Sequence, residues 1–267
     1  MIRAVSRTTA LAALSACLLL ALPGLAQAAE IRVMISGAFT AAYNELLPAF
    51  EQRTGHKVIT AYGASMGVAP DAIPVRLQRG EPADVVILAE AGLDKLIADG
   101  RIAAGSRVDI VRSAIGLAVR AGAPRPDIST VAALRKTLLE AKSIAYSASA
   151  SGVYLSTELF QRLGIVAEMN ITARKILSER VGSVVARGDA ELGFQQVSEL
   201  LPITGIDYVG PLPAEVQRVS VFTSGIMANA REPDAARALI AYMTSPEVAG
   251  VVTRTGLDPI PPAERKP

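Results

Sequence analysis

Residues Tyr146–Leu163 read YSASASGVYLSTELFQRL, and the interpretation of the whole chain starts from this stretch. It follows a short apolar segment and begins as a serine-rich turn. After the turn, apolar residues recur at helical spacing until Gly164, a typical C-terminal stop. A helix N-terminus has unpaired backbone N–H groups and a partial positive charge, so it attracts anions. The stretch predicts either an anion-binding helix start or a helix that Ser149 or Ser151 merely caps.

The same order of strand, small-residue turn and helix occurs twice earlier in the chain. Ile31–Ser36 is a near-continuously apolar strand, typical of a strand buried on both faces, and Gly37 follows it in the turn. Lys57–Tyr62 is a second strand, followed by a turn that contains Ser65 and Met66. Ligands of open α/β sheets bind at the carboxyl ends of the strands. The three turns therefore predict three walls of one cleft.

Strands and helices alternate along the remaining sequence, which is typical of an α/β chain with mostly parallel sheets flanked by helices. Two apolar segments, 110–120 and 219–227, have the length of strands that cross between two lobes. We expect residues 29–112 and 226–267 to form the first lobe and residues 113–225 the second. A single doubly wound domain is the alternative.

The first 28 residues have the pattern of a secretory signal peptide. Arg3 and Arg7 precede an apolar run, and Ala26-Gln27-Ala28 fits an A-x-A cleavage site. Cys17 lies in a lipoprotein-like box, but leucines follow it where an anchored cysteine normally has a polar tether. We therefore expect cleavage after about Ala28 and export of a soluble protein to the periplasm.

The composition excludes several classes of site. Cys17 is the one cysteine and leaves with the leader, so disulfides and thiol catalysis are excluded, and a single histidine, His56, excludes a multi-histidine metal site. The chain has 27 basic and 25 acidic residues, without the basic field that nucleic acid requires. It has no tryptophan to stack on sugars or bases. We expect a monomer that binds a small anion, with no metal, no organic cofactor and no nucleic-acid partner.

Further motifs resemble a known protein family. They are VMISGAF at 33–39, RGEPADVVI at 79–87, SGVY at 151–154, GDAELGF at 188–194 and a terminal SPE at 245–247 followed by GL at 256–257. Together they resemble periplasmic solute-binding proteins of the molybdate-binding-like, class II type, over nearly the whole mature chain. The resemblance implies two α/β lobes joined by two crossing strands, with an anion held between them by N–H groups and hydroxyls. By position, the implied ligand contacts are Ser36, Ser65, Gly152 and Ser178.

Two features depart from the molybdate-binding pattern. The tyrosine that closes on the oxyanion in that family falls at Gln196, and residues 68–74 form a longer insertion before Arg76. The chain is more similar to the family branch that contains aconitate isomerase. That branch implies interconversion of cis- and trans-aconitate by an allylic proton shift. The alternative is a transporter-associated solute-binding protein that delivers an oxyanion or a small carboxylate to an inner-membrane ABC permease.

A tricarboxylate requires cations, and a proton shift requires a base. Arg76 and Arg180 are the candidate cations, with a solvated helix face as the alternative role for each. The candidate bases are Tyr154, Glu90 and Glu179, each with a structural role as its alternative. The predicted binding residues are Ser36, Gly37, Ser65, Met66, Arg76, Ser149, Ser151, Gly152, Arg180 and Gln196.

Overall fold

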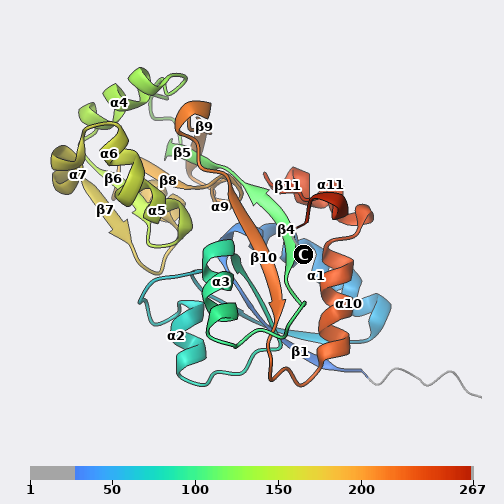
Figure 1. Ribbon diagram of the computed structural model, residues 1–267. Helices are drawn as coiled ribbons and strands as arrows, with labels where there is room; N and C mark the ends of the chain where they lie inside the picture. The colour runs from blue at the N-terminus through green and yellow to red at the C-terminus, as the bar shows by residue number, and fades with distance from the viewer. Residues whose placement is uncertain (1–27, 266–267) are drawn as a thin grey trace, which may run out of the picture.

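The computed structural model describes residues 28–265, so the predicted signal peptide lies outside the described residues. The chain forms two lobes, each built on one sheet (Figure 1). The first lobe has a six-stranded sheet in the order β11-β4-β10-β3-β1-β2, and the second has a five-stranded sheet in the order β7-β6-β8-β5-β9. No helix within residues 28–265 is long and apolar enough to span a membrane.

The first sheet consists of β1 (Glu30–Ile35), β2 (Lys57–Tyr62), β3 (Val85–Ala89), β4 (Val108–Ser113), β10 (Ser220–Ile226) and β11 (Asp258–Pro259). Its α-helices are α1 (Gly37–Thr54), α2 (Ile73–Gln78), α3 (Glu90–Ala98), α10 (Pro233–Met243) and α11 (Ala249–Arg254), with 3-10 turns at Pro246–Val248 and Pro262–Glu264.

The second sheet consists of β5 (Ile115–Arg120), β6 (Ile144–Ser147), β7 (Ala173–Ile176), β8 (Leu192–Gln196) and β9 (Ile206–Pro211). Its α-helices are α4 (Val131–Glu140), α5 (Ala150–Tyr154), α6 (Phe160–Arg162), α7 (Val166–Thr172), α8 (Val181–Ala186) and α9 (Val197–Leu200). A π-helical turn at Leu155–Leu159 joins α5 to α6, and a 3-10 turn lies at Ala214–Val216.

Strand β1 shows why the first lobe folds as a three-layer unit. Ile31, Val33 and Ile35 pack with α1 and α10 on one face of the sheet, whereas Met34 packs with α2 and α3 on the other. Successive residues of a strand point to opposite faces, so a strand covered on both sides must be apolar throughout. The near-continuous apolar run predicted this burial, and the structure confirms it.

Both sheets are mixed, which corrects the prediction of mostly parallel sheets. Parallel pairing joins β1 to β2 and β3, and it joins β6 to β7 and β8. Strands β5 and β10 pair antiparallel with their neighbours. The antiparallel strands are those next to the chain crossings, where the chain leaves one sheet and returns to it.

The chain crosses between the lobes twice (Figure 1). The segment predicted as one strand over 110–120 is two strands interrupted at Ala114, with Ser113 paired to Ser220 in the first sheet and Ile115 paired to Gln196 in the second. The return crossing lies between β9 and β10. Residues 220–225, which the predicted boundaries assign to the second lobe, pair within the first sheet.

Candidate functional site

A cavity of about 400 Å³ lies between the lobes, and we refer to it as the interlobe cavity. The first lobe contributes Gly37, Thr40, Asn44, Tyr62, Gly63, Ala64 and Asp71. The second lobe contributes Ser147, Ala148, Ser149, Ile176, Leu177, Ser178, Glu179, Arg180, Gln195 and Glu199. These residues lie at or just beyond the carboxyl ends of β1, β2, β6, β7 and β8, where α/β sheets bind ligands.

The first wall of the cavity is the N-terminus of α1. Ser36 is the extended residue that precedes this 18-residue helix, and its buried Oγ has no hydrogen-bond partner within residues 28–265. The first N–H groups of an α-helix lack intrahelical partners and form the positive end of the helix dipole. Gly37, the first helical residue, lines the cavity. Of the two predicted residues at this helix start, Gly37 lines the interlobe cavity and Ser36 lies directly before it.

The serine-rich turn is the second wall, and its members have different roles. Ser149 lines the cavity, and its Oγ accepts a hydrogen bond from the N–H of Ser65 across the lobes at 3.3 Å. The Oγ of Ser151 instead lies 3.0 Å from that of Ser147 inside the turn. Gly152 packs on the Ser147 carbonyl group, which a Cβ atom would overlap. Thus Ser149 faces the cavity, while Ser151 and Gly152 hold the turn in shape.

Ser65 contacts the cavity-lining Ser149 but does not itself line the interlobe cavity. It is fully buried, and its Oγ accepts a hydrogen bond from the N–H of Ala89 at 2.9 Å. The nearby insertion contributes Asp71, whose Oδ1 is buried without a partner within the described residues and which lines the cavity. A Cβ atom at Gly63 would overlap the Asp71 carbonyl oxygen, so a glycine is needed for the insertion to pack against the end of β2.

Arg180 is the cationic residue of the cavity wall. It immediately precedes α8, and its guanidinium makes no hydrogen bond or ion pair with other residues of the described range 28–265. The neighbouring Glu179 also lines the cavity, but it is exposed and its carboxylate is 2.8 Å from the guanidinium of Arg187. That hydrogen bond lowers the pKa of Glu179. Arg180 is therefore available to a ligand, whereas Glu179 is a paired surface carboxylate.

Glu199 is a site residue that the sequence analysis missed. It lies on the short helix α9, and its Oε1 accepts a hydrogen bond from Nε2 of Gln195 at 2.9 Å. Burial raises the pKa of Glu199 to about 7, against the opposing effects of Arg180 and the Gln195 hydrogen bond. The sequence feature that could have identified Glu199 is its position three residues after β8, a strand that ends in two glutamines.

The two glutamines at the end of β8 point in different directions. Gln195 lines the interlobe cavity, and its Oε1 accepts a hydrogen bond from the N–H of Val181 at 2.9 Å. Gln196, the residue predicted to replace the closing tyrosine, lies with its side-chain amide 3.1 Å from Oγ of Ser220 near the chain crossing. Neighbouring strand residues face opposite sides of a sheet. The cavity-facing residue is therefore Gln195 and not Gln196.

Four other predicted residues lie away from the interlobe cavity. Arg76 is on the first lobe with its guanidinium 2.6 Å from the carboxylate of Glu81. Met66, Glu90 and Tyr154 line a separate cavity of about 270 Å³.

Two candidate bases are already bonded in that separate cavity. The carboxylate of Glu90 pairs with Arg107 at 2.9 Å. The hydroxyl of Tyr154 donates to the carbonyl oxygen of Val216 at 2.6 Å. The structure therefore gives both residues local structural partners and does not bring them to the interlobe cavity.

Comparison with protein families shows which family the chain belongs to. The sequence model of a family described as bacterial extracellular solute-binding protein matches residues 31–258. The chain belongs to this family. The match spans both lobes and both chain crossings.

Individual members of the solute-binding family extend the comparison. The chain is 47% identical over 251 residues to an aconitate isomerase from a Pseudomonas species, covering 93% of this chain and 96% of that protein. It is 29% identical over 243 residues to the molybdate-binding protein ModA of Azotobacter vinelandii, covering 86% and 90%.

Solved structures of solute-binding proteins show the same fold. The periplasmic molybdate-binding protein of Azotobacter vinelandii superposes with a TM-score of 0.66 at 23% identity, covering 86% of this chain and 99% of that one. The sulfate-binding protein SubI of Mycobacterium tuberculosis gives 0.68 at 18% identity, covering 88% of each. These matches confirm the predicted two-lobed, class II architecture.

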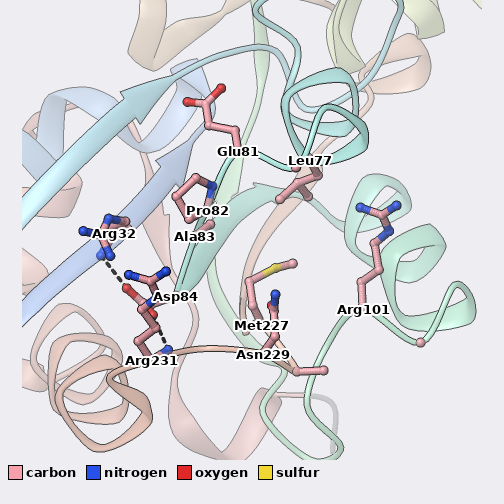
Figure 2. Close-up of a pocket in the computed structure, with 13 residues that line it drawn as sticks. Arg32, Leu77, Glu81, Pro82, Ala83, Asp84, Arg101, Met227, Asn229 and Arg231 are labelled. Carbon is pink, nitrogen blue, oxygen red and sulfur yellow. Dashed lines mark hydrogen bonds between the residues drawn. The ribbon is translucent and has the colours of Figure 1, made fainter.

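A larger cavity, of about 550 Å³, lies elsewhere on this solute-binding protein (Figure 2). Its lining residues include Arg32 near the start of β1 and Asp84 directly before β3. The cavity therefore lies at the amino ends of these strands. The Asp84 carboxylate accepts hydrogen bonds from the N–H groups of Arg32 at 2.7 Å and Arg231 at 2.6 Å. Asp84 thus ties loops of the first lobe together, and the interlobe cavity is the better candidate for the ligand site.

Proposed function

We propose that the protein is an exported aconitate isomerase of the periplasm, which interconverts cis- and trans-aconitate. The observation that supports this most directly is the 47% identity to an aconitate isomerase over 93% of the chain. The aligned region covers both lobes and therefore includes the segments that line the interlobe cavity.

The interlobe cavity suits a small polycarboxylate. Its volume of about 400 Å³ falls within the range of about 300–1,000 Å³ found for small-molecule sites. Arg180 offers a guanidinium that can bind a carboxylate through two parallel hydrogen bonds. The N-terminus of α1 offers N–H groups and the positive end of a helix dipole. Together they provide anchors for more than one carboxylate of the ligand.

The chemistry of the reaction is a proton transfer. A base removes a proton from the methylene carbon of aconitate, the electron pair of that C–H bond forms the new double bond, and a proton is returned to the far carbon of the former double bond. Negative charge develops on the adjoining carboxylate during the step. Fixed dipoles and cations placed at that carboxylate stabilise the charge. The α1 N-terminus and Arg180 are the groups that we assign to this role.

Delivery of an anion to a membrane permease is the second candidate function. It is favoured by membership of the solute-binding family and by the 29% identity to a molybdate-binding protein. Under this function the same cavity holds an oxyanion or a small carboxylate without changing it. The two candidates differ in whether the ligand leaves the cavity as an isomer.

The deciding experiment incubates the purified protein with cis-aconitate and, separately, with trans-aconitate. Proton NMR and ultraviolet absorbance follow interconversion, and calorimetric titrations with molybdate and sulfate run in parallel. We expect both starting compounds to reach the same equilibrium mixture. Tight molybdate binding without any interconversion would overturn the proposed isomerase and favour anion delivery.

A further inference from the structure

Resting on the isomerase function proposed above, we propose that Glu199 is the catalytic acid–base group, which takes the proton from the methylene carbon and returns it to the other end of the allylic system. The acidic residues that line the interlobe cavity are Asp71, Glu179 and Glu199. The geometry of Glu199 distinguishes it from the other two.

The carboxyl group of Glu199 is oriented through one oxygen. The first N–H of α8, from Val181, donates to Oε1 of Gln195, which fixes the direction of that amide. The amide then donates through Nε2 to Oε1 of Glu199 at 2.9 Å. Oε2 of Glu199 makes no hydrogen bond to residues within 28–265 and is left to exchange a proton. Gln195 is therefore a positioning residue for this carboxyl.

The surroundings of Glu199 allow both protonation states near neutral pH. Burial alone favours the neutral acid, whereas the positive charge of Arg180 favours the carboxylate. The balance gives a pKa of about 7, and a general base works best when its pKa is close to the operating pH. Glu179 has the opposite character, because its bond to Arg187 lowers its pKa and leaves it a weak base.

A single carboxyl can serve both ends of the substrate. The carboxylate of Glu199 breaks the methylene C–H bond and becomes the neutral acid, while the C–H electron pair forms the new double bond. The electron pair of the old double bond then takes the proton back from Glu199 at the far carbon. Both carbons flank the same central carbon, so the proton travels a short path. The step is balanced and regenerates the carboxylate.

The test compares Glu199→Gln and Glu199→Asp with two other changes. Asp71→Asn removes the competing cavity carboxyl, and Glu168→Gln alters an exposed glutamate on α7 as the matched control. General acid–base catalysis is worth about 100- to 10,000-fold, so we expect kcat of Glu199→Gln to fall by about that factor. The dissociation constant of aconitate should change by less than about tenfold, and Glu168→Gln should match the wild type.

Two further measurements separate catalysis from structure. The wild-type kcat/KM should fall as the pH drops below about 7, and this inflection should be displaced in Glu199→Asp. Because Glu199 returns the proton that it removed, aconitate converted by the wild type in D2O should gain less than one deuterium per turnover, whereas a full deuterium per turnover would indicate two separate acid–base groups. An active wild type with an equally active Glu199→Gln, or a loss confined to Asp71→Asn, would overturn this role alone. A wild type that binds aconitate without converting it would overturn the proposed function and this role together.

Discussion

The carboxyl group of Glu199 in the second lobe lies against the Cα atom of Gly37 in the first lobe. A Cβ atom built on Gly37 would overlap Oε1 of Glu199 and lie 2.6 Å from its Cδ. Gly37 opens the 18-residue helix α1, so the contact places the carboxyl at the positive end of that helix dipole. The same contact joins the two lobes at the wall of the interlobe cavity.

The absence of a side chain at Gly37 should matter for activity more than for stability. In Gly37→Ala the new methyl group displaces the flexible end of Glu199, which can rotate away from α1. Because only the flexible end of a side chain has to move, we expect the free energy of unfolding to change by less than about 1 kcal/mol. Because displacement of a reacting group by about 1 Å can cost about 100-fold, we expect kcat to fall at least about tenfold.

Gly250→Ala is the matched control for this change. Gly250 lies in α11, and its nearest atom to a new Cβ is a side-chain nitrogen of Arg254 at 4.0 Å. Thermal unfolding and steady-state kinetics of both variants make the comparison. Full activity in Gly37→Ala would show that the Glu199–Gly37 contact has no part in catalysis.

The raised pKa of Glu199 predicts a specific dependence of stability on pH. Its pKa is raised from 4.5 to about 7 in the folded chain, so between these values the folded state binds more protons than the unfolded state. This contribution is fully present below about pH 4.5 and is lost as the pH rises through about 7. The shift corresponds to on the order of 3 kcal/mol. Glu199→Gln should therefore gain stability relative to the wild type between pH 5 and pH 8.

Urea unfolding at pH 5, 6, 7 and 8 measures this difference. We expect the gap in unfolding free energy between Glu199→Gln and the wild type to widen steadily over this range. Parallel pH profiles for the two proteins would contradict a raised pKa of Glu199 in the folded chain. The comparison needs no substrate, so it is independent of the proposed reaction.

Arg180 should contribute to both ligand affinity and the ionisation of Glu199. Hydrogen bonds to charged groups are worth about 1.5–3 kcal/mol, so Arg180→Gln should weaken aconitate binding by roughly 10- to 100-fold. The positive charge of Arg180 lowers the pKa of Glu199, and its removal should move the inflection of the pH–rate profile upward. Arg125→Gln is the control, because Arg125 forms an exposed ion pair with Asp207. Unchanged affinity in Arg180→Gln would remove Arg180 from the site.

Much of the fold was predictable because its causes are local. The apolar run of β1 indicated a strand covered on both faces, and small residues at Gly37 and in the Ser147–Gly152 turn indicated where helices start. The two lobes followed from alternating strands and helices together with two candidate crossings. The break at Ala114 was not predictable, because strand-forming residues lie on both sides of it and only the pairing partners differ.

The candidate site was predicted only in part, for reasons of direction and partners. Gln196 was the predicted binding residue at the end of β8, whereas the residue that lines the interlobe cavity is its neighbour Gln195, on the opposite face of the strand. Arg76 and Tyr154 have suitable chemistry, but Glu81 and the Val216 carbonyl group already bind them. Such partners cannot be recognised from the sequence, because they lie outside the helix that carries the predicted residue. Glu199 was missed because a four-residue helix has too little periodicity to detect.

Gly152 should be the least tolerant position of the serine-rich turn. A Cβ atom there would overlap the Ser147 carbonyl oxygen and lie 2.7 Å from the carbonyl carbon, and both atoms belong to the backbone. No side chain can move to relieve the clash, so α5 must shift away from the end of β6. Overpacking of this kind typically costs about 1–3 kcal/mol. We expect Gly152→Ala to lower the unfolding free energy in urea by at least about 2 kcal/mol, and Gly250→Ala to leave it within about 1 kcal/mol. Equal stability of the two variants would mean that the turn adapts freely and that glycine is not required at its helix start.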